Sequence, residues 1–254
     1  MASFADLVAE AMTAPIHGWD FSWLKGRATE ERPWWGYRGL AAQEVTAATT
    51  VLDVQTGGGE LLAEILTDAA DRPAVVVVTE SWPPNVARAR HNLEPFGVWV
   101  TETVENGDLP FDDGTFDLVL SRHPVATRWD EVARVLRPGG VYLAQHVGDG
   151  SNRELVEFLM GPQPASGRRS PQRAVVDAQT AGLWVLDLRT ASLRVEFFDV
   201  GAIAYFLRLV VWTVPDFDVE RYHKQLLALH EQIQREGSFV SHAKRLLIEA
   251  VKPG

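Results

Sequence analysis

The chain has 254 residues, a formal net charge of −10 and a hydrophobic share of 46%. It contains no cysteine, which excludes disulfides, thiolate nucleophiles and cysteine-based zinc sites. Because nucleic-acid binding relies on Lys and Arg to neutralise phosphates, the acidic charge argues against a nucleic-acid partner.

The length and the ordinary composition predict one globular domain over residues 1–254. The N-terminal stretch MASFADLVAE has no basic segment followed by an apolar run, so no signal peptide is expected. No apolar run reaches the roughly 20 residues of a membrane helix, so no membrane contact is expected either. These features predict a cytoplasmic protein, and they leave its oligomeric state open.

The first element with a clear pattern covers residues 50–80, after an aromatic-rich segment at 1–49 that is predicted to form a helical lid. VLDV is typical of a buried strand, the glycines of 57–59 indicate a turn, and Glu60 opens a helical pattern. A second buried strand precedes Glu80, which follows the last turn glycine by 80 − 59 = 21 residues. That spacing indicates a βαβ unit whose acid binds the ribose hydroxyls of a nucleoside.

Strands and helices continue to alternate after this unit. Residues 50–147 read as a βαβαβ core, and residues 148–254 are predicted to complete the sheet. The later elements are predicted as a short helix ending at Met160, a helix from about Pro171 to Gly182, a strand over 184–189, an apolar helix over 200–211, a helix over 218–235 and a last strand over 239–251.

Three motifs follow one another over residues 50–146. They are TVLDVQTGGGE at 50–60, LPFDDGTFDLVLSRH at 109–123 and EVARVLRPGGVYLAQH at 131–146. Together they resemble class I S-adenosylmethionine-dependent methyltransferases of the small-molecule type, with a methyltransferase type 11-like domain. The segment FVSHAKRLLIEAVKP also resembles the last antiparallel strand of such enzymes.

The resemblance implies an α/β fold with S-adenosylmethionine as cofactor. Its doubly wound, Rossmann-like sheet would be mostly parallel, with an antiparallel last strand and helices on both faces. The site residues would lie at the carboxyl ends of the strands. The implied cofactor contacts are Asp53, Thr56, Gly57 and Gly59 for the methionine part, Glu80 for the ribose, Ser81 and Trp82 for the adenosine, Glu105 and Asn106 for the adenine, and Ser121 along the cofactor side. Asp108, also near this motif, is interpreted as a solvated turn acid.

Gln55 is also among the implied cofactor contacts, but it departs from the family pattern, because it stands where the first glycine of the turn is normally found. We expect S-adenosylmethionine to bind in spite of it, since Asp53 and Glu80 are retained. The alternative is a degenerate protein with this fold that no longer methylates. The turn also lacks the G-x-G-x-x-G pattern of dinucleotide enzymes.

Two histidines follow predicted strands and are candidates for a general base. His123 comes just after the strand of the second motif, and His146 ends the strand of the third. A neutral imidazole could remove a proton from an acceptor near pH 7, although each ring could equally serve as a structural hydrogen-bond partner. His17, His91, His223, His230 and His242 lack this position, and no spacing indicates a metal site.

The acceptor is predicted to be a small molecule held by aromatic side chains. Trp34 and Trp35 lie in a loop-like R-P-W-W-G-Y segment and could line its pocket, whereas Trp23 is predicted to pack in the interior. Arg38 could bind a carboxylate of the acceptor. RNA is the alternative acceptor, but the one evident basic cluster, at 167–173, is interpreted as a solvated linker.

Overall fold

The computed structural model describes residues 2–16 and 18–254, so His17 lies outside the described residues. The chain divides into two compact units. The larger contains Pro33–Gly148, Gly167–Ala191 and Arg245–Gly254, and the smaller contains Met1–Arg32, Asp149–Ser166 and Ser192–Lys244. The larger unit therefore includes the aromatic loop at 33–36, which was predicted as part of the lid. The single-domain organisation stays a prediction.

In the described part of the chain, eight strands are joined by hydrogen bonds in the order β1-β7-β8-β6-β5-β2-β3-β4. Their bounds are β1 (Ala28–Glu30), β2 (Thr50–Val54), β3 (Val75–Glu80), β4 (Trp99–Glu102), β5 (Phe116–Arg122), β6 (Leu136–Val147), β7 (Trp184–Phe197) and β8 (Phe239–Val251). Strands β2 to β6 run parallel, whereas β8 is antiparallel to β6. The predicted α/β sheet with its antiparallel last strand is confirmed.

Helices flank these strands in both units. Those of the larger unit are α2 (Tyr37–Ala47), α3 (Glu60–Asp68), α4 (Pro83–Leu93), α5 (Trp129–Val135) and α7 (Pro171–Thr180), with the short η2 (Glu94–Phe96). Those of the smaller unit are α1 (Phe4–Thr13), α6 (Arg153–Met160), α8 (Val200–Leu209) and α9 (His223–Glu236), with the short η1 (Ser22–Leu24). Among the described residues, no helix has the length and apolar character needed to cross a membrane.

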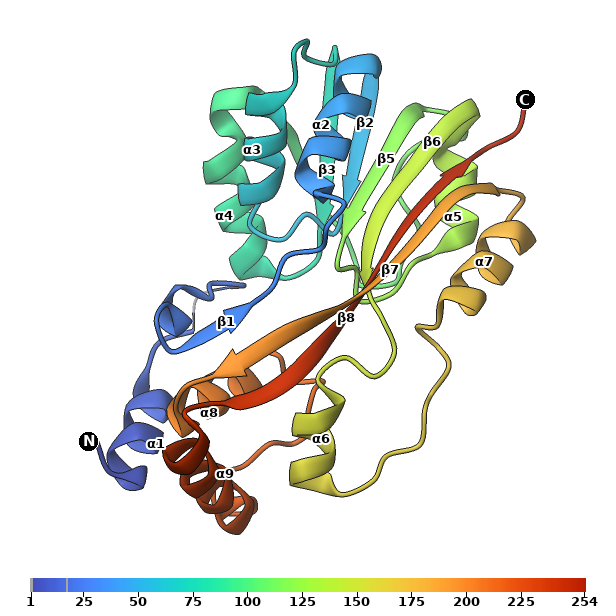
Figure 1. The fold of residues 1–254 in the computed structure, drawn as a ribbon. Helices are drawn as coiled ribbons and strands as arrows, with labels where there is room; N and C mark the ends of the chain where they lie inside the picture. The colour runs from blue at the N-terminus through green and yellow to red at the C-terminus, as the bar shows by residue number, and fades with distance from the viewer. Residues whose placement is uncertain (1, 17) are drawn as a thin grey trace. The chain divides into compact units, whose positions relative to one another are not determined.

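The larger unit has three layers, with helices on both faces of the sheet (Figure 1). Neighbouring residues of a strand point to opposite faces, so each strand contributes to two cores. Val51 packs with α2, α3 and α4 on one face. Leu52, the next residue along β2, packs with α5 and α7 on the other. Burial on both faces explains why the parallel strands read as unbroken apolar runs.

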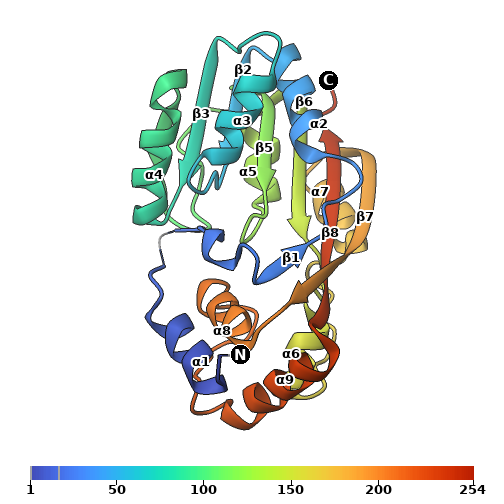
Figure 2. The same ribbon diagram turned by 60° about the vertical axis from the view of Figure 1, so that its left-hand side comes forward.

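The smaller unit is built around α8, which lies beside α1 (Figure 2). Every residue of α8 except Arg208 is buried. The Arg208 guanidinium donates to the carbonyls of Ala11 and Ala14 at the end of α1, the latter at 3.0 Å. Trp23 is half-buried and stacks on Tyr205 with ring centroids 4.5 Å apart, so it packs within the smaller unit.

The C-terminal elements follow the predicted order. The last strand has the predicted bounds, and the apolar helix predicted over 200–211 is α8. Helices α7 and α8 end two residues earlier than predicted, at Thr180 and Leu209, and two other bounds differ more. Helix α9 begins at His223 instead of residue 218, since the preceding residues form turns. Strand β7 continues to Phe197 instead of ending at 189, because its hydrogen bonds to neighbouring strands carry it through the polar stretch that follows.

Two of the recognised motifs stabilise the sheet at the edge opposite the carboxyl ends of the strands. The Asp117 carboxylate, at the start of β5, accepts the backbone N–H groups of Thr49 (2.8 Å) and Thr50 (2.6 Å) and the Thr50 hydroxyl. Arg137 of the L-R-P-G-G segment pairs with the same carboxylate at 3.2 Å. A Cβ at Gly140 would come within 3.0 Å of the Phe116 carbonyl oxygen, so this glycine allows β5 and β6 to approach.

Replacing Asp117 with alanine is expected to lower the free energy of unfolding by about 2–3 kcal/mol, because two backbone N–H groups lose a charged partner. Chemical denaturation at neutral pH would measure the change. Asp112→Ala in the neighbouring exposed loop is the matched control and should change stability by less than about 0.5 kcal/mol. Equal stability of the two variants would show that the carboxylate contributes little.

Candidate functional site

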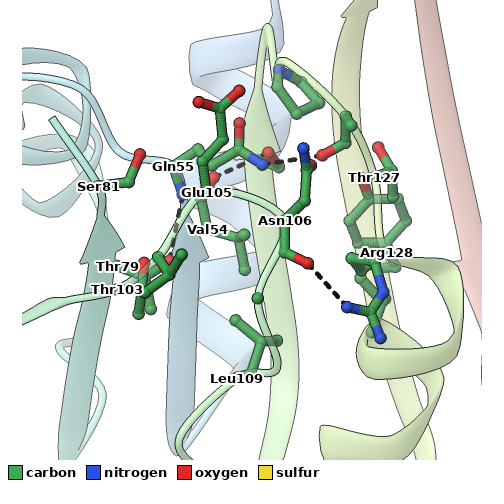
Figure 3. A pocket seen from close by; sticks show the side chains of 17 residues that line it. Val54, Gln55, Thr79, Ser81, Thr103, Glu105, Asn106, Leu109, Thr127 and Arg128 are labelled. Carbon is green, nitrogen blue, oxygen red and sulfur yellow. Dashed lines mark hydrogen bonds between the residues drawn. The ribbon is translucent and has the colours of Figure 1, made fainter.

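A hollow of about 590 Å³, including the solvent at its mouth, lies at the carboxyl ends of β2, β3 and β5 (Figure 3). The predicted site residues that line it are Gln55, Ser81, Glu105, Asn106 and Ser121. Residues that the sequence did not single out also line it, among them Thr127, Arg128 and Tyr142. Tyr142 was missed because it reads as an ordinary member of a buried strand.

The Gly-rich turn connects β2 to α3 beside this hollow. Gly57 and Gly59 have φ values of 67° and 78°, which favour glycine. A Cβ at Gly59 would come within 2.8 Å of the Leu93 side chain, so the turn also needs a small residue to pack against α4. The predicted backbone donors are engaged within the chain, since Thr56 N–H donates to the Thr79 carbonyl at 3.0 Å.

Glu80 ends β3 and is 6% exposed. One carboxylate oxygen accepts the Gly57 N–H at 2.8 Å, and the other accepts the N–H groups of Ser81 and Trp82, each at 2.9 Å. The acid therefore ties the Gly-rich turn to the start of α4. Its Oε2 retains a lone pair for a hydroxyl donor, because a carboxylate can accept about four hydrogen bonds.

Asp53 lies near the end of β2 and is 8% exposed. Burial raises the pKa of its carboxyl to about 7, and the nearby Glu80 carboxylate raises it further, while the Thr56 hydroxyl lowers it. A buried carboxyl of this kind is half-ionised near neutral pH, so a cation placed beside it would shift it to the ionised form. The ammonium group of an amino acid would be such a cation.

Gln55 adopts the left-handed conformation that normally favours glycine, with φ 58°. Its side chain reaches the connection between β5 and α5, where Nε2 donates to the Ala126 carbonyl at 2.8 Å (Figure 3). Its Oε1 accepts the Val125 N–H, also at 2.8 Å. The conformation costs about 1 kcal/mol or more. Two hydrogen bonds of about 1 kcal/mol each offset that cost.

The loop between β4 and β5 carries Glu105 and Asn106, which are exposed and line the hollow. Arg128 donates to the Asn106 carbonyl at 2.8 Å (Figure 3), and it pairs with Asp108 at 3.1 Å. Asp108 is exposed, as the sequence predicted for a turn acid. The middle of this loop is fixed by Glu131, whose carboxylate accepts the Leu109 N–H at 2.6 Å.

Two of the predicted site residues are placed at the strand ends. The Ser121 hydroxyl is buried and donates to the Val54 carbonyl at 2.8 Å, which links β5 to β2. Trp82 is 40% exposed at the start of α4, so its ring is accessible to a planar ligand. Asn85, one turn further on, is fully buried, and neither atom of its amide has a partner among the described residues.

His123 belongs to a buried chain of hydrogen bonds. Trp35 Nε1–H donates to Gln145 Oε1 at 2.8 Å, and Gln145 Nε2 lies 3.0 Å from His123 Nε2. Because an indole only donates, the amide must present its NH₂ group to His123, whose Nε2 is then the acceptor. Burial, with Arg122 and Arg245 nearby, lowers the pKa of His123 well below its usual value. The basic nitrogen of this ring is therefore already engaged.

His146 lies near Tyr142 at the end of β6. Its Nε2 is 3.1 Å from the Tyr142 hydroxyl, and its ring centroid is 5.9 Å from that of Trp129. Burial lowers the pKa of His146 to about 4, with Arg169 contributing, so the ring is neutral at pH 7. The catalytic roles of both histidines stay predictions, and their hydrogen bonds favour structural roles. Among the described residues, no group of three or more His, Asp or Glu side chains could hold a metal ion.

The three residues predicted to bind the acceptor lie apart from the hollow. Trp35 is 6% exposed and packs in the core, where it donates to Gln145, whereas Trp34 is 73% exposed. Arg38 pairs on the surface of α3 with Asp68, at 2.5 and 2.7 Å, and with Glu64 at 2.7 Å. Its guanidinium is thus engaged by carboxylates of the chain itself, which argues against a role in acceptor binding.

The segment that contains this site matches a known family. Residues 52–144 match the family model described as a methyltransferase domain. The chain carries a class I methyltransferase domain. The cofactor of the methyltransferase is S-adenosylmethionine. The match covers the Gly-rich turn, both acids and the motifs that hold the sheet together, so the family resemblance seen in the sequence is confirmed.

Solved structures share the fold of the methyltransferase at low sequence identity. The YcgJ protein of Bacillus subtilis has 18% identity and a TM-score of 0.61, covering 86% of this chain and 98% of its own. A candidate methyltransferase from Bacillus halodurans C-125 has 18% identity and a TM-score of 0.58, with 86% and 97% coverage. A Haloferax volcanii methyltransferase candidate, in complex with the Trm112 methyltransferase activator, has 18% identity and a TM-score of 0.55, with 98% coverage of each chain. No curated protein matches the sequence.

Proposed function

We propose that this methyltransferase transfers the methyl group of S-adenosylmethionine to a small-molecule acceptor. The observation that carries the proposal is the convergence of Asp53, Glu80 and the Gly-rich turn at the carboxyl ends of β2 and β3. The bound cofactor would supply a methyl group activated by its sulfonium. The chain must bind and orient it, and must keep water away from it.

The residues present fit this cofactor. Glu80 would accept a ribose hydroxyl, since it is buried and its Oε2 holds a single hydrogen bond from the protein. Asp53 would face the ammonium of the methionine part, because its carboxyl is buried and has a pKa of about 7. Glu105 and the Asn106 N–H would face the adenine, and Ser81 and Trp82 the adenosine.

The acid–base requirement of the reaction depends on the acceptor. A base is needed only when the acceptor must lose a proton during attack. His123 and His146 each have Nε2 engaged by a neighbouring side chain. Proton removal by either ring would require that hydrogen bond to break first. The geometry therefore favours an acceptor that is already nucleophilic at neutral pH, such as an unprotonated amine or a thiolate.

Two alternative functions are an RNA methyltransferase and a binding protein without catalysis. An RNA acceptor would need a basic surface, which the net charge of −10 disfavours. A binding protein without catalysis would be favoured if Gln55 blocked the cofactor. The Gln55 amide is paired at both ends with the β5–α5 loop, which supports a formed site.

Calorimetric titration with S-adenosylhomocysteine tests the cofactor site. We expect micromolar binding by the wild type. A second assay incubates the protein with S-adenosylmethionine and pools of small amines, thiols and phenols, with transfer RNA as a separate arm, and detects S-adenosylhomocysteine formation. Turnover with RNA alone would contradict the proposed acceptor class, and absence of S-adenosylhomocysteine binding would contradict the function.

A further inference from the structure

The connection between β5 and α5 forms one wall of the hollow. It covers residues 123–128. Four of these residues line the hollow: Pro124, Ala126, Thr127 and Arg128. His123 adopts the left-handed conformation with φ 57°, and its N–H donates to the Gln145 carbonyl at 2.6 Å. The loop is therefore anchored firmly at its start.

The middle of this loop is held mainly by Gln55. The Val125 N–H and the Ala126 carbonyl both bond to the Gln55 amide at 2.8 Å. The Val125 carbonyl has a weaker contact with Arg169 at 3.5 Å. A glycine at position 55 would leave the Val125 N–H and the Ala126 carbonyl without these bonds, and the wall of the hollow would lose its connection to the Gly-rich turn.

We propose that Gln55 is a positioning residue of the cofactor site, which clamps the 123–128 loop to the Gly-rich turn so that the loop forms a fixed wall of the hollow. This inference rests on the proposed function only for the identity of the ligand. A side chain at this position usually suggests a damaged turn. Here both ends of the amide are hydrogen-bonded to the loop, so the residue organises the hollow. A pre-organised wall reduces the ordering cost of ligand binding.

Amide hydrogen exchange at Val125, measured by NMR on ¹⁵N-labelled protein, tests the clamp without any ligand. We expect protection in the wild type and exchange at least about tenfold faster in Gln55→Ala and Gln55→Gly, with unchanged core amides such as that of Val119. The two variants are a matched pair. Glycine removes the clamp and tolerates the left-handed backbone, whereas alanine removes the clamp and retains the strain. An unprotected Val125 amide in the wild type would overturn the proposal.

Binding of S-adenosylhomocysteine tests the consequence for the site. We expect both variants to bind about tenfold more weakly than the wild type, as for loss of pre-organisation. Gln55→Glu adds a pH profile, because only the protonated acid can both donate to the Ala126 carbonyl and accept the Val125 N–H. The affinity ratio of wild type to Gln55→Glu should therefore shrink toward one as the pH falls from about 6 to about 4, through the ordinary carboxyl pKa of about 4.3.

Tighter binding by Gln55→Gly or Gln55→Ala would show that the clamp obstructs the cofactor, and it would overturn the proposal. An affinity ratio that stays constant with pH would do the same. If the wild type fails to bind S-adenosylhomocysteine, the proposed function is contradicted, while Val125 exchange still decides whether the clamp exists.

Discussion

Glu80→Ala is expected to weaken the binding of S-adenosylhomocysteine at least about tenfold. A hydrogen bond from a hydroxyl to a charged group contributes about 1.5–3 kcal/mol, so the loss of the one that the free lone pair of Oε2 can accept exceeds the roughly 1.4 kcal/mol that corresponds to this factor. The same change removes the shared acceptor of the Gly57, Ser81 and Trp82 N–H groups. Isothermal titration calorimetry would measure the affinity.

The matched control is a substitution of Glu102 on the neighbouring strand. Glu102 of β4 is the register partner of Glu80, but its side chain is exposed and makes a 3.8 Å ion pair with Arg90. Glu102→Ala should therefore leave the affinity unchanged. A Glu80→Ala variant that remains folded by circular dichroism and binds within about threefold of the wild type would show that this acid does not hold the ribose.

The position of Glu80 could be predicted because its determinants are local. A buried strand, a Gly-rich turn, a helix and a second strand leave one acid at the edge of the sheet, whatever the rest of the chain does. The motifs at 109–123 and 131–146 were recognisable for a different reason. Asp117, Arg137 and Gly140 act on the sheet itself, at the start of β5 and β6. Their pattern therefore indicated the fold, and only indirectly the site.

Other features depend on partners distant in sequence and could not be predicted in this way. Gln55 bonds to residues 70 and 71 positions away. Trp35 and Gln145 are 110 positions apart, so nothing local indicated that this indole is buried. Arg38 was predicted to contact the acceptor because it follows the aromatic segment and could reach a carboxylate. Its bidentate pair with Asp68 forms only because α2 packs against α3, and the sequence around Arg38 does not indicate that packing.

The second large effect is expected from Asp53, whose protonation makes the folding stability depend on pH. The pKa of its carboxyl is about 7 in the folded protein, against an ordinary value of 3.8, and burial is the main cause. The folded protein therefore holds a proton that the unfolded chain releases between these values. The associated stability is greatest below about pH 4 and is lost as the pH rises to about 7. A difference of about three units corresponds to as much as about 4 kcal/mol.

Asp53→Asn removes this titration while keeping the size of the side chain. Its unfolding free energy should exceed that of the wild type by a few kcal/mol at pH 8, and the difference should vanish toward pH 4. Urea denaturation across this range would measure it, and parallel curves for the two proteins would contradict a raised pKa at Asp53.

Binding provides an independent measurement, because an ammonium beside the carboxyl favours its ionised form. Calorimetry near pH 6.5 in two buffers of different ionisation enthalpy should detect proton release when the wild type binds S-adenosylhomocysteine, and none that is attributable to this site in Asp53→Asn. Equal proton release by both proteins would place the ammonium group elsewhere.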